Sequence, residues 1–219
     1  MTFDRIILID KPAGMTSFGV VARVRRQLSE KAGKKIKLGH TGTLDPFATG
    51  LLVLLSGKMT KKSDEFLKLD KEYIATIVLG QTSTTGDPEG EIKPSTNCFE
   101  PPVKSQIEKT LKTFEGEIIQ TPPIYSAIKI NGRRAYDLAR KGENPEMPKR
   151  RVKIYQIELL SYVYPKLELR VKCSSGTYIR SLAEDIGKSL NCGAFTNELR
   201  RTKIGEYDVA NADESFTIE

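Results

Sequence analysis

The segment G-H-T-G-T-L-D-P-F-A-T-G at Gly39–Gly50, followed directly by the apolar run Leu51–Leu55, constrains the fold of this chain more than any other. An uninterrupted apolar run of this kind is typical of a buried strand. The polar residues before it, punctuated by three glycines, then form a loop fixed to that strand. Loops held by a rigid scaffold are frequent positions for reactive side chains, and Asp45 is the side chain that this loop offers.

Length and charge limit the class of protein. The chain has 219 residues and a net charge of +7, which suits one large mixed domain or two small ones and favours an anionic partner, with nucleic acid first. The alternative is a soluble protein that is merely basic. No apolar run approaches the ~20 residues needed to cross a bilayer. The start M-T-F-D-R does not resemble a signal peptide, so we expect a cytoplasmic protein that does not bind membranes.

The cysteine and histidine counts argue against metal centres. The three cysteines, Cys98, Cys173 and Cys192, show no C-x-x-C spacing, which disfavours a disulfide framework and a zinc site and fits a reducing compartment. His40 is the single histidine, and no compact acidic cluster suggests Mg²⁺. We therefore expect no metal.

The periodicity predicts alternating strands and helices. Strands are expected at Arg5–Ile9, Leu51–Leu55 and Lys71–Leu79, and a long hairpin at Val152–Tyr164 and Leu167–Cys173. Helices are expected after a cap at Thr16 or Ser17 and at 61–69, 101–114, 135–141, 178–190 and 196–201. Residues 81–90 are expected to form a loop and Asn131-Gly132 a hairpin turn. This mixture predicts an α+β fold with a central, mostly antiparallel mixed sheet and flanking helices.

Asp45 is the leading catalytic candidate. An aspartate before proline is most often a turn or cap residue. Here the surrounding glycines allow a ligand to approach the backbone closely, and a lone carboxylate serves as a nucleophile or as a base. A Ser-His-Asp hydrolase using His40 with Ser17 or Ser56 is disfavoured, because the chain has no G-x-S-x-G motif. His40 is then a base-stacking or phosphate-contacting residue, or a structural one.

Arg180 and Tyr73 are weaker candidates. Arg180 lies in the first turn of an expected helix, where a cation opposes the helix dipole. A carboxylate partner such as Asp45 would explain that position, since such pairing keeps the carboxylate ionised; the alternative is an exposed arginine. Tyr73 near the start of a strand most often packs in a core. Basic residues also form five sets that suit phosphate contacts, namely Lys31/Lys34/Lys35/Lys37, Lys58/Lys61/Lys62, Arg133/Arg134, Lys149/Arg150/Arg151/Lys153 and Arg200/Arg201.

Taken together, these segments resemble the TruB family of tRNA pseudouridine synthases. The resemblance rests on motifs that follow the family's order along nearly the whole chain: D-K-P-A-G-M-T-S at Asp10–Ser17, the Gly39–Gly50 segment, K-E-Y at Lys71–Tyr73, L-G-Q-T-S-T-T-G-D at Leu79–Asp87, T-P-P-I-Y-S-A-I-K-I-N-G-R-R-A-Y at Thr121–Tyr136, C-S-S-G-T-Y-I-R at Cys173–Arg180 and G-A-F-T-N-E-L-R-R-T at Gly193–Thr202.

The resemblance implies the pseudouridine synthase catalytic fold and isomerisation of the uridine at tRNA position 55. It implies Asp45 as the covalent catalyst, Arg180 as its partner, and Tyr73 against the uracil, where it assists proton movement. Tyr178 and Leu199 would line the base pocket, and His40 would contact the RNA where the flipped nucleotide leaves the T loop. No cofactor and no obligate protein partner are implied.

The chain stops at Glu219 where many relatives continue into a PUA-type RNA-binding domain, so we expect a single catalytic domain over residues 1–219 and no PUA domain. We expect a monomer that binds the T stem-loop of tRNA. Two other interpretations are the related guide-RNA-dependent enzymes that modify ribosomal RNA, and a tRNA-folding chaperone that acts without catalysis.

Overall fold

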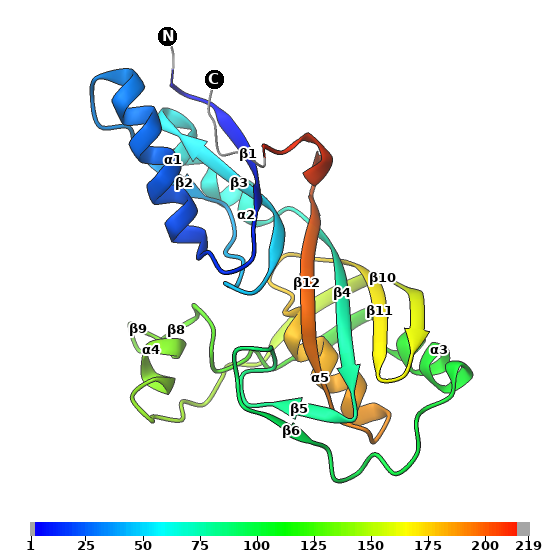
Figure 1. The fold of residues 1–219 in the computed structure, drawn as a ribbon. Helices are drawn as coiled ribbons and strands as arrows, with labels where there is room; N and C mark the ends of the chain where they lie inside the picture. The colour runs from blue at the N-terminus through cyan, green and yellow to red at the C-terminus, as the bar shows by residue number, and fades with distance from the viewer. Residues whose placement is uncertain (1–2, 214–219) are drawn as a thin grey trace. The chain divides into compact units, whose positions relative to one another are not determined.

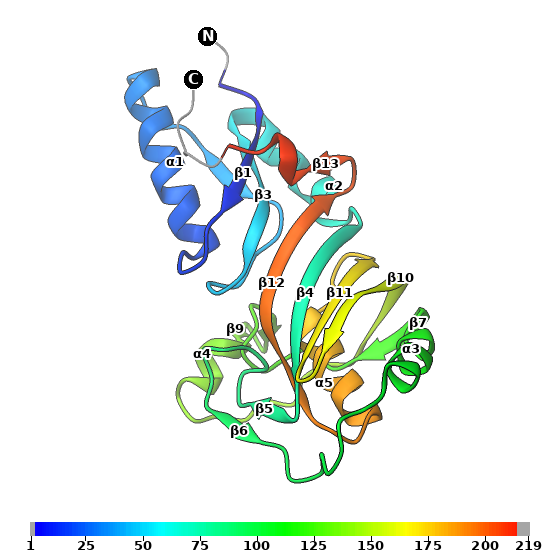
Figure 2. The same ribbon diagram turned by 45° about the vertical axis from the view of Figure 1, so that its right-hand side comes forward.

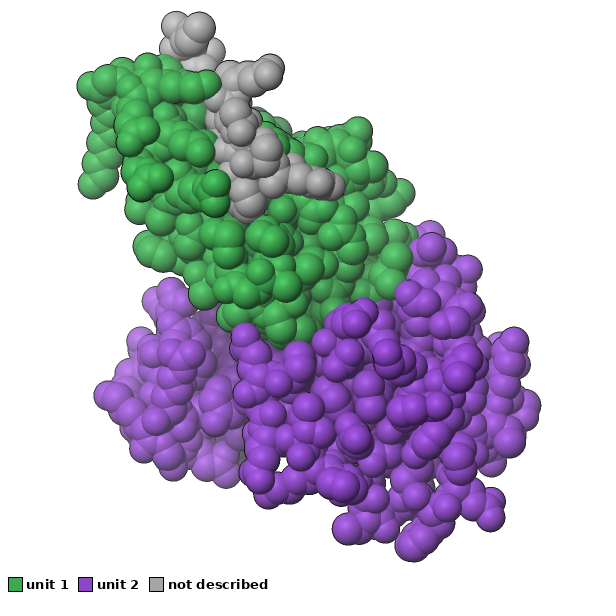
Figure 3. All heavy atoms as spheres, viewed as in Figure 1, with its two compact units in different colours: residues 1–74, 199–219 green, residues 75–198 purple. Residues whose placement is uncertain are grey.

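The computed structural model describes residues 3–213 (Figure 1). The chain divides into two compact units, coloured green and purple in Figure 3: unit 1 comprises Met1–Ile74 with Leu199–Glu219, and unit 2 comprises Ala75–Glu198. The strands β4 (Lys71–Leu79) and β12 (Ala194–Ile204) each contribute residues to both units. That residues 1–219 act as a single catalytic domain stays a prediction.

Unit 1 holds one long helix and short strands at the two ends of the chain. Its further elements are β1 (Ile6–Lys11), α1 (Ser17–Ala32), β2 (Leu38–His40), β3 (Thr49–Ser56), the 3-10 helix η1 (Gly57–Lys62), α2 (Ser63–Leu67), β13 (Tyr207–Asp208) and the 3-10 helix η2 (Val209–Asn211).

Unit 2 holds the long hairpin and three helices among its described residues. Its further elements are β5 (Gln81–Ser83), β6 (Ile92–Pro94), α3 (Lys104–Thr113), β7 (Gly116–Gln120), β8 (Lys129–Ile130), β9 (Arg133–Arg134), α4 (Ala135–Ala139), β10 (Arg150–Val163), β11 (Lys166–Cys173) and α5 (Ile179–Ser189).

One mixed sheet connects most of the strands. Within residues 3–213 it has nine strands, in the order β1-β3-β12-β4-β11-β10-β7, with β2 paired to β3 and β13 to β12 (Figures 1 and 2). The pair β12–β3 is parallel, whereas β1–β3, β2–β3, β10–β11 and β7–β10 are antiparallel. The pairs β5–β6 and β8–β9 form two small separate sheets. This arrangement confirms the expected α+β class.

Strand β3 explains why the run Leu51–Leu55 is apolar throughout. Leu52 and Leu54 belong to the hydrophobic cluster that includes Val20, Val24 and Leu28 of α1. The intervening side chains of β3 belong to a second cluster on its other side, which contains Leu51, Val53, Leu55, Phe66 and Ile204. Because both faces of the strand are covered, the alternation expected of a half-exposed strand is absent, and the predicted buried strand is confirmed.

Local signals also placed α1 and the two predicted hairpins correctly. Thr16 caps α1 by accepting the amide proton of Gly19 at 3.0 Å, and Gly33 ends it with a positive φ of 62°. Asn131 and Gly132 adopt positive φ angles between β8 and β9, as the hairpin signal predicts. In β11, Leu167, Leu169 and Val171 are fully buried, which confirms the alternating pattern of the long hairpin.

Two predictions of secondary structure are wrong. Residues 196–201, expected to be helical, lie within β12. Leu199 and Arg201 are both buried and lie two residues apart, which is the spacing of one face of a strand. Because one of the two is an arginine, the alternation of apolar and polar residues that predicts a strand is absent from the sequence. Part of the expected loop 81–90 is the strand β5, which pairs with β6. Both strands are short and largely exposed, and they therefore carry little hydrophobic signal.

The cysteines differ from expectation. Cys98 and Cys192 form a disulfide across a sequence separation of 94 residues, and Cys173 lies buried outside it. The number and spacing of the cysteines disfavoured a disulfide framework, and this one disulfide runs against that expectation. Counts and local spacings concern neighbours in sequence, whereas this pair meets only through the fold of unit 2.

Residues 3–213 contain neither a membrane-spanning helix nor a cluster of metal-binding side chains. No helix there is long and apolar enough to span a membrane. No three His, Cys, Asp or Glu side chains there gather in a way that would hold a metal ion.

Gly50 provides a test of the packing between β3 and β12. Its φ is 103°, and a Cβ atom built on it would lie 2.7 Å from the backbone nitrogen of Arg201. We expect Gly50→Ala to destabilise the protein by more than about 2 kcal/mol, because the left-handed backbone strain and the backbone clash add. The measurement is the free energy of unfolding in urea.

The matched control is Gly39→Ala in strand β2, where a Cβ atom would meet nothing within 4 Å. We expect a change of less than about 1 kcal/mol there. Equal effects of the two substitutions would contradict the close approach of β3 and β12 at Gly50.

Candidate active site

Asp45 lies in the loop between β2 and β3, in unit 1. The antiparallel pairing of His40 with Leu54 brings the start of the loop back along β3. Within the loop, the Ala48 amide donates to the Asp45 carbonyl oxygen at 3.2 Å and closes a tight turn. The Asp45 side chain is half-buried. The loop therefore presents a carboxylate from a short, strand-anchored turn.

Two side chains hold this turn, one from the end of β1 and one from the start of α1. Ser17 is freed for the purpose because Thr16 caps the helix; its hydroxyl donates to the Leu44 carbonyl at 2.9 Å and accepts the Leu44 amide at 2.8 Å. Lys11 is fully buried, and its ammonium donates to the carbonyls of Pro12, Met15 and Pro46 at 2.8, 2.8 and 3.2 Å. Carbonyl oxygens thus offset the desolvation of a buried cation.

A second buried cation holds the other flank of the loop. Arg201 of β12 is only 2% exposed, and its guanidinium donates to the carbonyls of Leu51, Gly42 and Thr43 at 2.8, 3.1 and 3.5 Å. One planar group therefore fixes the residues before and after Asp45. Because Lys11, Ser17 and Arg201 bind the backbone, the geometry of the loop depends on side chains other than that of Asp45.

Three further predicted site residues lie in unit 1. His40 ends β2, and its Nδ1 accepts the Gly42 amide at 3.4 Å, which places the ring proton of a neutral imidazole on Nε2. Tyr73 of β4 and Leu199 of β12 are both 8% exposed and lie on neighbouring strands. Near them, the Thr202 hydroxyl donates to the Glu72 carboxylate at 2.7 Å.

Arg180 lies in unit 2, in the first turn of α5, and is buried with a partner that the sequence did not reveal. Its Nη1 donates to the Asp87 carboxylate at 2.8 Å, in an ion pair whose side chains are 3% and 4% exposed. The guanidinium also donates to the carbonyls of Thr85 and Tyr125 at 2.9 and 2.8 Å. These contacts account for a cation at this position, which is not the exposed arginine of the alternative interpretation.

Asp87 is itself fixed by its own turn. Its carboxylate accepts the amide of Glu89 at 3.0 Å and the hydroxyl of Thr85. Sequence reasoning placed Asp87 in a motif but gave it no role. The T-G-D-P sequence is the local signal for this turn, because it places an aspartate directly after a glycine. In the structure that glycine, at position 86, has a φ of 72°.

Tyr178 precedes α5 and is half-buried. The buried Gln120 binds its backbone from both sides, since the Tyr178 amide donates to Oε1 at 3.1 Å and Nε2 donates to the Tyr178 carbonyl at 3.2 Å. The Arg150 guanidinium lies 5.4 Å from the centre of the Tyr178 ring, within cation–π range. The ring is therefore held beside a positive charge.

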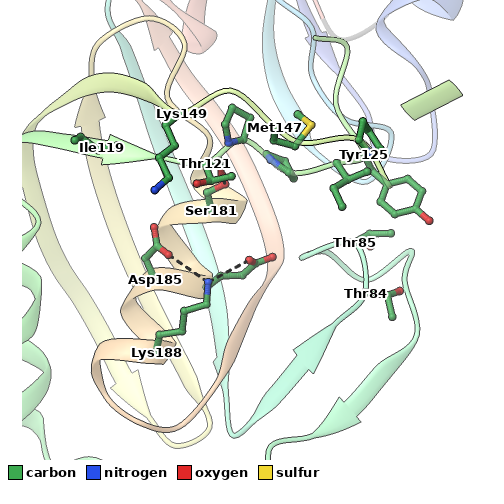
Figure 4. Close-up of a pocket in the computed structure, with 15 residues that line it drawn as sticks. Thr84, Thr85, Ile119, Thr121, Tyr125, Met147, Lys149, Ser181, Asp185 and Lys188 are labelled. Atoms are coloured by element: carbon green, nitrogen blue, oxygen red, sulfur yellow. Dashed lines mark hydrogen bonds and ion pairs between the residues drawn. The ribbon is translucent and has the colours of Figure 1, made fainter. Parts of the chain in front are cut away.

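Unit 2 also contains a cavity of about 690 Å³ (Figure 4). None of the predicted site residues lines it. Its walls include Thr85 and Tyr125, whose carbonyls accept hydrogen bonds from Arg180. They also include Lys188 of α5, whose ammonium lies 3.5 Å from the Asp185 carboxylate and 4.0 Å from that of Glu184. Burial raises the pKa of Glu184, against the opposing effect of Lys188.

Comparison with known proteins identifies the family. The chain matches the profile of the TruB family pseudouridylate synthase N-terminal domain over residues 25–179 and that of the tRNA pseudouridylate synthase B C-terminal domain over residues 180–219. It is 48% identical to the tRNA pseudouridine synthase B of Phocaeicola vulgatus over 92% of this chain and 86% of that protein. The same enzyme of Flavobacterium johnsoniae is 48% identical over 95% of this chain and 91% of that protein.

Solved structures agree with this assignment. A chain from the crystal structure of a Cbf5-Nop10-Gar1 complex superposes with a TM-score of 0.69 at 34% identity, over 92% of this chain and 50% of that one. A chain of the archaeal box H/ACA sRNP Nop10-Cbf5 complex gives 0.66 at 32% identity, over 93% and 48%. The expected pseudouridine synthase fold is confirmed, and the chain belongs to the TruB family of pseudouridylate synthases.

Proposed function

We propose that this protein converts uridine 55 in the T loop of tRNA into pseudouridine, with Asp45 as the covalent catalyst. The observation that carries the proposal is the Asp45 loop, in which a carboxylate is presented from a backbone fixed by Lys11, Ser17 and Arg201. The names of the 48% identical relatives support tRNA as the substrate. A preorganised carboxylate suits attack on a substrate that must itself be held still.

The reaction is an isomerisation, so the nucleoside keeps its composition, but the hydrogen on C5 leaves to solvent and N1 takes up a proton. The Asp45 carboxylate forms a bond to the nucleotide, and the N-glycosidic bond breaks. The uracil then turns and joins the same ribose through carbon, after which the bond to Asp45 is released. Neither an oxidant nor a second substrate is needed to balance these steps.

The remaining predicted residues surround the flipped base in this proposal. The uridine must leave the stacked loop before reaction, at a cost of a few kcal/mol that contacts with the RNA offset. Tyr73 and Leu199, both buried on adjacent strands, suit the walls of a base pocket. Tyr178 with its Arg150 neighbour suits contact with an anionic ligand, and His40 suits contact with the RNA where the nucleotide leaves the loop.

Arg180 is proposed to keep Asp45 ionised, as the sequence suggests. Its ion pair with Asp87 supports this role indirectly, because a guanidinium held by one carboxylate and two carbonyls is a rigid donor. We further propose a cytoplasmic monomer without an obligate protein partner. The protein partners in the titles of the Cbf5 structures belong to those complexes.

Asp45→Asn should abolish turnover and retain RNA binding. We expect the rate to fall by more than about a thousand-fold, because the amide is a poor nucleophile, while the anchored loop keeps its shape. The measurement uses unmodified tRNA transcript labelled with tritium at C5 of its uridines and counts the tritium released without added cofactor. Release of about one equivalent per tRNA by wild type alone supports the proposal.

The same assay separates the alternatives. Tight tRNA binding without tritium release from wild type would favour a chaperone or a guide-dependent enzyme. Equal release by wild type and Asp45→Asn would remove Asp45 from the chemistry.

Arg180→Ala should lower turnover strongly and leave RNA binding largely intact. Because the substitution also leaves the Asp87 carboxylate buried without its cation, we expect it to destabilise unit 2 by about 3–5 kcal/mol. The double substitution Arg180→Ala with Asp87→Asn removes that uncompensated charge. We expect the double variant to regain stability, measured by urea unfolding, while its turnover in the tritium assay stays low.

Recovery of turnover in the double variant would show that Arg180 serves only to compensate Asp87. Loss of tRNA binding in the single variant, at a temperature where it is folded, would make Arg180 a phosphate contact instead.

Arg201→Lys should impair turnover through the position of the Asp45 loop. A lysine keeps the charge but lacks the planar guanidinium, whose three nitrogens reach Leu51 after Asp45 and Gly42 and Thr43 before it, so we expect a fall in kcat of up to about a hundred-fold with little change in tRNA affinity. The matched control is the neighbouring Arg200→Lys, since Arg200 pairs with Asp10 at 3.1 Å and, among the described residues, donates to the Thr49 hydroxyl but to no carbonyl of the Gly39–Gly50 segment. Similar kcat values for the two variants would contradict the anchoring role of Arg201.

A further inference from the structure

Five lysines line a cavity in unit 1 at a distance from the Asp45 loop. The cavity has a volume of about 470 Å³, and its lysines come from two segments that are separate in sequence: Lys34, Lys35, Lys37, Lys58 and Lys61. All five are exposed, and within residues 3–213 none of them forms an ion pair. Several unneutralised cations around one hollow repel one another and attract an anion with more than one charge.

The two lysine segments are held in place by their backbones. The Gly57 amide donates to the Lys37 carbonyl at 2.8 Å, which joins the segments directly. Ile36 is 6% exposed, belongs to the core cluster under α1, and donates its amide to the Ser29 hydroxyl at 3.1 Å. The lysines on either side of Ile36 therefore project from a fixed stretch of chain, and binding an anion there does not require the segment to order.

The single acidic residue of the lining, Asp4, offsets one of the lysine charges, and the cavity stays positively charged. The Asp4 carboxylate accepts the backbone amide of Lys58 at 2.8 Å. None of the large exposed hydrophobic side chains among the described residues lines the cavity, so the apolar anchor that a membrane surface would use is missing there. A ligand that offers repeated phosphates without apolar contact fits this chemistry best.

The position of the cavity within unit 1 separates it from the reaction. Ser17, the first residue of α1, binds Leu44 beside Asp45, whereas the lysine segment 34–37 follows the last residue of the helix. A helix of 16 residues is about 24 Å long. Figures 1 and 2 show α1 extending between these two ends. A nucleic acid bound at both places would span on the order of seven backbone steps.

We propose that this lysine cavity binds the phosphodiester backbone of the substrate tRNA at a second place, several nucleotides from the uridine that enters the Asp45 loop. The inference rests on the proposed function for the identity of the RNA. It assigns to unit 1 a contact that strengthens tRNA binding without taking part in the chemistry.

The test compares the salt dependence of tRNA binding between wild type and the variant Lys34→Gln/Lys35→Gln/Lys37→Gln. Each phosphate contact contributes about 0.7 to 0.9 to the slope of log K against log salt. We expect the slope for full-length unmodified tRNA to fall by about two to three, with affinity at moderate salt weakened roughly tenfold or more. Thermal unfolding of the variant should match wild type, because the substituted side chains are exposed.

The matched control removes three exposed lysines from α3 in unit 2, as Lys104→Gln/Lys109→Gln/Lys112→Gln, and should leave the slope unchanged. An equal fall in the control would show that only net charge matters and would overturn the site. An unchanged slope in the cavity variant would overturn it as well. A fall as large on an RNA hairpin cut to fewer than about seven nucleotides on each side of the target uridine as on full tRNA would contradict a contact several nucleotides away.

Failure of the proposed function would appear in the tritium assay, whereas failure of the lysine cavity would appear in the salt slopes. If wild type releases no tritium from tRNA, the reaction is wrong, while the salt slopes still report on the cavity. If both proposals hold, the cavity variant at saturating enzyme concentration converts tRNA at the wild-type rate.

Discussion

The structure of the candidate site depends on buried cations whose hydrogen-bond acceptors include main-chain carbonyls. Arg201 and Lys11 take positive charge into the interior of unit 1, and each donates three hydrogen bonds to carbonyl oxygens, including those of Gly42 and Thr43 for Arg201 and of Pro46 for Lys11 in the Asp45 loop. Loops that contain several glycines lose much conformational entropy when they become ordered. The cations offset this loss because movement of the loop would take acceptors away from both of them, Pro46 from Lys11 and Gly42 and Thr43 from Arg201.

Strand β3 connects this loop to the rest of unit 1. Its side chains enter one hydrophobic cluster with α1 and another with α2 and β12, so the strand cannot shift without opening both. Gly50, at the start of the strand, allows β12 to approach closely enough for Arg201 to reach across. The packing of the apolar run therefore also fixes the position of the polar loop that precedes it.

Much of this arrangement follows from sequence and some of it does not. The buried strand, the cap at Thr16, the hairpins and the exposure of a carboxylate at Asp45 have local signals in hydrophobic period and turn residues. The roles of Arg201 and Asp87 have none, because each depends on a contact between residues about 90 or more positions apart. For the same reason the disulfide was missed, and a strand that buries an arginine was mistaken for a helix.

The anchoring of the loop by Arg201 has a consequence for kinetics. A guanidinium stays protonated in proteins and a backbone carbonyl does not titrate, so hydrogen bonds between them persist across the range in which a carboxylate changes its charge. A scaffold fixed in this way keeps its shape as acidity varies. A pH–rate profile of this enzyme would then report the ionisation of groups that meet the substrate, undistorted by any opening of the loop that carries Asp45.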